Sequence, residues 1–254
     1  MTFSLAAAFV LAGFIGVSLG LLGSGGTIIT LPVLVYVAGV PVPQAVGMAL
    51  AVVGGTSLAG SVLQYRRGCF EPRVALLFAL TGMAGAYGGA RLTHWVSPAV
   101  LLLLFAGLML VVGATMLRRR QEVKPAAACR PVRCAALGAV VGVVTGFLGV
   151  GGGFLIVPAL ALFGGLDMKK AVGTSLGVIA LNSLSGLLGQ LRYTQFDWWT
   201  TLAFLAAATV GMAVGVAGAG RLSETALRRA FAWFIIVVAL VLAWRNGMAL
   251  AASF

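Results

Sequence analysis

Long uncharged stretches dominate the chain. The 17 Lys and Arg and the 5 Asp and Glu fall into seven short clusters, at 66–73, 91, 118–133, 167–170, 192–197, 221–229 and 245. Most of the apolar stretches between them are long enough for the roughly 20 residues of a membrane-spanning helix. Only 9% of the residues are charged, against roughly 25% in soluble domains. This pattern excludes a soluble globular protein and predicts an all-α polytopic membrane protein in contact with the lipid bilayer.

The charges also limit the partners. A formal net charge of +12 would suggest nucleic acid if it formed a patch on a folded domain, but the basic residues lie in loops, where they hold a loop in the cytoplasm. We expect no nucleic-acid partner. No Asp, Glu, Lys, Arg or His lies deep in an apolar segment, so we expect no catalytic residue, metal site, cofactor or enzymatic activity.

The chain contains an internal duplication. A shift of 126 residues aligns 16–70 with 142–196 without a gap, and 21 of the 55 pairs are identical. The segment 118–133 between the halves holds six basic residues. We therefore predict an N-terminal membrane repeat at 1–117, a basic cytoplasmic linker at 118–133 and a C-terminal membrane repeat at 134–254.

Each repeat begins with a glycine-interrupted apolar stretch, and two topologies are open. If the stretch crosses the membrane once, the basic residues divide 11 inside to 6 outside; if it turns back, the division is 14 to 3. The positive-inside rule favours the second topology. We predict two repeats of about four membrane segments each, about eight in all, inverted relative to one another, with the first segment of each broken or re-entrant.

Two Gly-rich boxes, 20–27 and 146–153, are each followed by a proline, Pro32 or Pro158. Glycine with a downstream proline breaks a helix, and a break within hydrocarbon is tolerated only in protein or beside a polar cavity. The half-helix after the break presents free N–H groups and a positive dipole end, which suit an anion. The candidate binding residues in the boxes are Gly23, Ser24, Gly25, Gly26, Thr27, Gly149, Gly151, Gly152 and Gly153. The alternative is that these glycines only allow close helix packing.

Polar side chains recur at matched depth in the next helix of each repeat. Hydroxyl and amide groups can bind an oxyanion without a buried charge. The candidates are Thr56, Ser57, Thr174, Ser175, Asn182 and Ser183, with Gln64 and Gln190 as secondary candidates. For any one of them the alternative is a hydrogen bond between helices. Arg66 and Arg192 end these helices and are further secondary candidates, either attracting an anion or anchoring the helix at the interface.

These motifs together resemble the sulfite exporter TauE/SafE family, also called toluene sulfonate uptake permeases. The resemblance rests on the duplicated Gly-rich box with its proline, on Ala171-Val-Gly-Thr-Ser-Leu176 with its copy Ala45-Val-Gly-Met-Ala-Leu50, and on the basic linker. It implies an inner-membrane permease for sulfur-containing anions such as sulfite, sulfonates or sulfoacetate.

Residues and resemblance together predict a secondary transporter with a small anionic substrate held between the repeats. A passive anion channel and a non-transporting scaffold or accessory subunit are the alternatives. The sequence leaves open the exact substrate, the direction of transport, any coupling ion and the oligomeric state, a homodimer included.

Overall fold

The computed structural model describes residues 2–92, 98–118, 131–148, 153–190 and 197–251. Helices account for nearly all of this part of the chain, which contains no strand. The elements in order are α1 (Thr2–Leu22), α2 (Gly25–Pro32), the π-helix η1 (Val33–Val37), α3 (Val42–Arg66), α4 (Pro72–Leu92), α5 (Pro98–Arg118), α6 (Pro131–Leu148), α7 (Gly153–Pro158), the π-helix η3 (Ala159–Phe163), α8 (Met168–Gln190), α9 (Trp198–Arg221) and α10 (Glu224–Ala251).

Three of the described helices are long and apolar enough to cross a membrane by themselves, over Gln44–Arg66, Met168–Leu188 and Trp198–Arg221. Shorter apolar helical stretches include Gly25–Val37 and Gly153–Phe163. Large apolar side chains also face outward: Val10 is 74% exposed and Val210 is 68% exposed. Such a surface is unfavourable in water and suits lipid, so the fold is that of a helical membrane protein.

The order of elements repeats with the offset seen in the sequence. The helices α3 and α8 begin 126 residues apart, and so do α4 and α9. Both prolines of the Gly-rich stretches are followed by a five-residue π-helix, η1 or η3. The two π-helices end alike, because Gly39 and Gly165 both have a positive φ.

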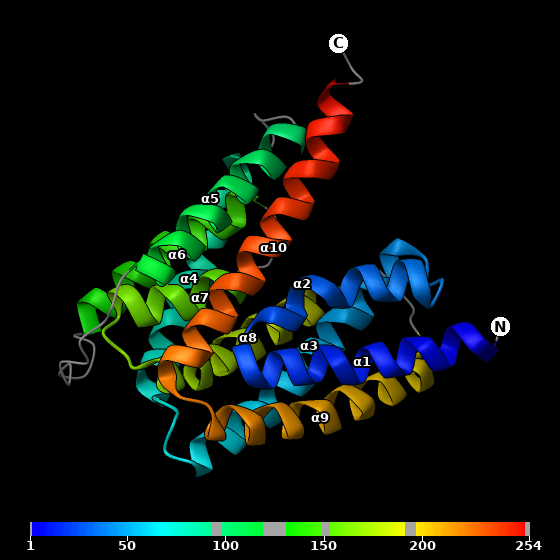
Figure 1. Ribbon diagram of the computed structural model, residues 1–254, viewed down its shortest axis with the longest axis horizontal. Helices are drawn as coiled ribbons and strands as arrows, with labels where there is room; N and C mark the ends of the chain where they lie inside the picture. Colours follow the sequence, from blue (N-terminus) through cyan, green and yellow to red (C-terminus); the bar gives the residue numbers. More distant parts are fainter. Residues whose placement is uncertain (1, 93–97, 119–130, 149–152, 191–196, 252–254) are drawn as a thin grey trace.

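Helices of one repeat pack mainly against helices of the other repeat. The first helix of each repeat lies against the fourth helix of the other, α1 on α9 and α6 on α4, while α3 packs on α8 and α5 on α10 (Figure 1). The contacts therefore look alike when the two repeats are interchanged. Because these contacts run between the repeats, the two repeats do not form two separate helical bundles.

Glycine allows these helices to approach closely. A methyl group at Gly20 of α1 would lie 2.5 Å from the carbonyl oxygen of Met212 on α9, and one at Gly16 would collide with the Ala208 carbonyl. On the other side, one at Gly142 of α6 would collide with the backbone of α4. Small residues at such crossings are typical of membrane helices. At Gly20, glycine thus allows close helix packing, which is the alternative to a role in anion binding.

The helices α3 and α8 run antiparallel. A methyl group at Gly60 of α3 would lie 3.0 Å from the Leu176 side chain, and one at Gly186 of α8 would lie 3.2 Å from the Leu50 side chain. Residue numbers therefore fall along one helix as they rise along the other. The two helices that occupy equivalent places in the repeats therefore lie in antiparallel contact.

Candidate functional site

The chain turns back on itself at the first Gly-rich box. The helix α1 ends at Leu22 and α2 begins at Gly25, and α2 then runs beside α1 in the opposite direction (Figure 1). Gly23 has φ +76°, a conformation that residues with a Cβ rarely adopt, and its N–H donates to the Leu19 carbonyl at 2.7 Å. The sequence therefore places the helix break correctly.

The start of α2 is uncapped. Ser24 occupies the N-cap position, where a serine hydroxyl normally accepts an N–H from the first turn, but its side chain makes no capping hydrogen bond. Within the described residues, the first backbone N–H of this turn with a backbone partner is that of Thr27, 3.3 Å from the Ser24 carbonyl. Free N–H groups and the helix dipole give this end about half a positive charge.

Five buried side-chain oxygens in the described part of the chain have no hydrogen-bond partner. They are Ser18 Oγ, Ser24 Oγ, Thr56 Oγ1, Ser57 Oγ and Asn182 Oδ1. Unpartnered buried polar groups are unfavourable, and their presence in a protein calls for a ligand, an ion or water. Four of the five are residues that the sequence predicts as ligands.

Ser18 is the residue that the sequence analysis missed. Its side chain is 7% exposed, and its Oγ lies against Gly25, so that a methyl group there would collide with it. In sequence, Ser18 is a small residue in an apolar helix, which is typical of packing. The one available indication is that its equivalent in the second repeat is Val144.

Three other predicted ligands already have partners. Thr27 Oγ1 donates to the Ser24 carbonyl at 2.7 Å, and Thr174 Oγ1 accepts the N–H of Glu71 at 3.1 Å. Ser175 Oγ lies 3.2 Å from the Gly23 carbonyl and 2.7 Å from the Val172 carbonyl. Thr174 holds the chain before α4, and Ser175 ties α8 to the break.

Two glycines of the first box face α1 closely. A methyl group at Gly26 would lie 2.7 Å from the Ile15 carbonyl oxygen and 2.6 Å from the Leu19 side chain. One at Gly25 would collide with Ser18 and lie 3.2 Å from Phe234. Both residues therefore permit the tight turn of α2 onto α1. This agrees with the alternative interpretation, in which these glycines allow close helix packing. A larger side chain at Gly26 would disturb the fold, whether or not an anion binds there.

The second box is described only at its end. Gly149, Gly151 and Gly152 lie outside the described residues, as do Arg192 and the side chain of Gln190. Gly153 begins α7, and a methyl group on it would lie 2.8 Å from Thr27 Oγ1. The first turns of the two half-helices therefore meet, through residues that occupy equivalent positions in the two repeats.

The remaining candidates lie along α3 and α8. Ser183 is 6% exposed and its Cβ would lie 3.0 Å from a methyl group at Gly54, within the α3 and α8 crossing. Gln64 is 5% exposed. Arg66 is exposed at the end of α3, whereas its neighbour Arg67 donates from Nη1 to the Val216 carbonyl of α9 at 2.6 Å.

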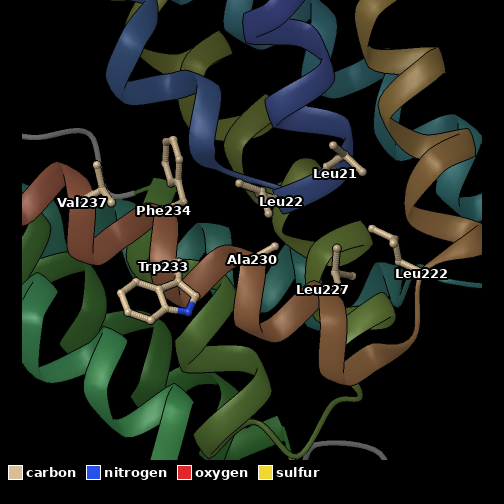
Figure 2. Close-up of a pocket in the computed structure, with 8 residues that line it drawn as sticks. All are labelled: Leu21, Leu22, Leu222, Leu227, Ala230, Trp233, Phe234 and Val237. Atoms are coloured by element: carbon tan, nitrogen blue, oxygen red, sulfur yellow. The ribbon is translucent and has the colours of Figure 1, made fainter.

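A groove of about 380 Å³ lies between the end of α1 and α10, as Figure 2 shows. Leu21 and Leu22 line one side, and Trp233, Phe234 and Val237 are among the α10 residues that line the other. This lining is apolar and offers an anion almost no donors. The groove adjoins the break, because Phe234 also lies against Gly25, but its lining lacks the polar groups of the site that the sequence predicts.

Comparison with known proteins agrees with this architecture. The profile of the family described as "Sulfite exporter TauE/SafE" matches residues 6–242. A "Probable membrane transporter protein" of Xylella fastidiosa is 35% identical over 248 residues, covering 94% of this chain and 95% of the relative. YdhB of Bacillus subtilis, also a "Probable membrane transporter protein", is 25% identical and covers 85% of this chain and 91% of the relative. No solved structure matches the chain.

The fold and these matches define the class of protein as a membrane transporter. The chain belongs to the sulfite exporter TauE/SafE family.

Proposed function

We propose that the protein is an inner-membrane permease for a small anion, and that this anion contains sulfur, as in sulfite, a sulfonate or sulfoacetate. The observation that carries the proposal is the break at Gly23 and Ser24. There an uncapped helix start and two unpartnered serine hydroxyls are buried together. The break offers donors and partial positive charge inside the membrane, and the sulfur chemistry rests on the family.

An inverted topology is part of the proposal. The antiparallel contact of α3 with α8 supports it, because two equivalent spanning helices that run antiparallel must cross the membrane in opposite directions. The hairpin of α1 and α2 supports it as well. Gly25–Val37 covers about 20 Å at 1.5 Å per residue, which is less than the roughly 30 Å core.

The same symmetry supports a site near the middle of the membrane. If inverted repeats relate α3 to α8 by a pseudo-twofold axis, that axis passes near residues 55 and 181, because the close approaches pair Gly54 with Ser183, Gly60 with Leu176 and Leu50 with Gly186. Thr56 and Asn182, another equivalent pair with unpartnered oxygens, are their neighbours. The contact of Thr27 with Gly153 joins equivalent positions too, so both lie close to the pseudo-twofold axis. Rocking of one half about this axis would expose a site to each side in turn.

Counterflow in proteoliposomes tests the proposal. Vesicles loaded with unlabelled sulfite should accumulate labelled sulfite from outside, because a carrier exchanges its substrate across the membrane. A steady conductance without counterflow would indicate a channel. Vesicles that move neither sulfite nor a sulfonate would contradict transport of these anions and favour an accessory subunit.

A further inference from the structure

We infer that the chain holds one anion site rather than two, at the break between α1 and α2, and that this site takes a singly charged oxyanion such as a sulfonate or hydrogensulfite. The inference rests on the proposed function. It adds to that function the number of sites, the charge of the ligand and the binding residue Ser18.

Four hydroxyl groups at and around the first break have no polar counterpart in the second repeat. Ser18, Ser24, Thr27 and Thr30 of the first repeat correspond to Val144, Val150, Gly153 and Ile156 of the second. In all four pairs the residue of the first repeat carries a hydroxyl group and its counterpart does not. The first break can donate hydrogen bonds from side chains, while the aligned residues of the second carry no polar side chain.

In α3 and α8, the helices that follow the breaks, the polar residues lie instead in the second repeat. Thr174 and Ser175 of α8 correspond to Met48 and Ala49 of α3. Because Ser175 Oγ lies 3.2 Å from the Gly23 carbonyl as well as 2.7 Å from the Val172 carbonyl of its own helix, the polar start of α8 lies against the polar break of the other repeat. Polar residues that are specific to each repeat thus meet at one half-site, which we define as Ser18, Ser24, the first turn of α2 and Ser175.

Two side chains of this half-site are free to bind a ligand. Ser24 is 0% exposed and Ser18 is 7% exposed, and neither Oγ has a hydrogen-bond partner. Ser18 Oγ lies beside Gly25, the first residue of α2. An anion bound at the start of α2 would satisfy both hydroxyls and the free backbone N–H groups together.

The available charge sets the charge of the ligand. No charged residue occurs between Met1 and Tyr65 or between Ala171 and Leu191, so α1, α2 and the α8 residues that contact Gly23 supply only neutral donors and roughly half a unit of charge at the helix end. A single negative charge is largely balanced by this arrangement. A dianion would keep an unpaired charge in a low-dielectric interior, which is strongly unfavourable.

Anion titrations of the purified full-length protein test the inference, with methanesulfonate as the monoanion and sulfate as the dianion. Methanesulfonate should raise the Tm of the wild type and bind with a stoichiometry of one per chain, and sulfate should do neither. Ser18→Ala and Ser24→Ala should each raise the Kd for methanesulfonate about tenfold, through the loss of one charge-assisted hydrogen bond. The Tm without anion should not fall, since neither hydroxyl has a hydrogen-bond partner to lose.

Thr145→Val is the matched control. Thr145 is a buried hydroxyl in the second repeat whose Oγ1 donates to the Gly142 carbonyl of its own helix at 3.1 Å, and its loss should leave the Kd unchanged. An unchanged Kd in both serine variants, two ions per chain, or tighter binding of sulfate would overturn the inference, while counterflow by the wild type would still support the proposed function. A wild type that neither binds nor transports any of these anions would overturn both.

Discussion

The broken pair α1 and α2 and its counterpart α6 and α7 occupy equivalent places in the two repeats, yet they differ in polarity. In each, the first helix packs on the fourth helix of the other repeat, and a proline leads into a five-residue π-helix. Only the first pair carries serine and threonine at the break. The packing is therefore repeated in both halves, whereas the hydroxyl groups at the first break are not.

The largest expected effect tests whether the packing is symmetric. Gly16→Ala and Gly142→Ala place a methyl group against a backbone carbonyl at equivalent positions of the two repeats. We expect each to lower the free energy of unfolding by about 3 kcal/mol, at the upper end for overpacking. Equilibrium unfolding in mixed micelles measures this. Gly107→Ala, with open space around it, is the control, and a large difference between the two repeats would break the comparison.

The contact of Ser175 with the Gly23 carbonyl gives the next effect. Ser175→Ala should cost about 1 kcal/mol through one lost hydrogen bond, and it should raise the KM for counterflow because the break is no longer held in place. Ala49→Ser, the equivalent change in α3, should improve neither stability nor KM. A gain of affinity in Ala49→Ser would show that the starts of α3 and α8 are interchangeable.

Thr56→Val is expected to raise the stability of the protein, whereas the preceding substitutions lower it. Thr56 Oγ1 is buried without a partner, and an apolar group of the same shape removes that desolvation cost. The variant should be more stable than the wild type by about 1 kcal/mol in the absence of anion, and it should bind methanesulfonate as tightly as the wild type because Thr56 lies outside the half-site at the break. A destabilised variant would mean that Thr56 has a structural partner, and weaker binding of methanesulfonate would extend the site to the crossing of α3 and α8.

The smallest effect concerns the start of α9. Asp197 caps this helix by accepting the Trp199 N–H at 2.9 Å and the Thr200 hydroxyl at 2.5 Å, and the Thr200 hydroxyl holds the pKa of this carboxyl below its ordinary value. A lowered pKa means that the stabilisation is present above the pKa of the unfolded chain and is lost as the pH falls through the folded one. Asp197→Ala should lower the Tm slightly at neutral pH.

At acidic pH, where the wild-type carboxyl is protonated, this difference in Tm should disappear. A thermal-melt series across pH measures it. A difference that persists in acid would mean that Asp197 acts through something other than its charge.

Much of the fold follows from local sequence features. The break at Gly23 and Ser24 was predictable because glycine and proline act on the backbone at their own positions. The packing of α1 on α9 was not, because a glycine-lined face indicates close packing without naming its partner. Only the folded chain shows that Gly16 meets Ala208.

The candidate site divides in the same way. The sequence selects Thr56 and Asn182 as candidates because the duplication aligns polar residues of the two repeats, and their role in binding stays a prediction. Ser18 could not, since its lack of a partner depends on how α2 folds back beside it. Thr174 was predicted as a ligand, but its hydroxyl accepts the N–H of Glu71, a contact between repeats that the local pattern does not contain.

Crystals of the protein soaked in selenite, a heavier analogue of sulfite, would give an anomalous difference map at the selenium edge. We expect one peak per chain, within hydrogen-bond distance of Ser18 Oγ and Ser24 Oγ at the start of α2. A peak of equal height beside Gly153, or none near the break in α1, would contradict the account.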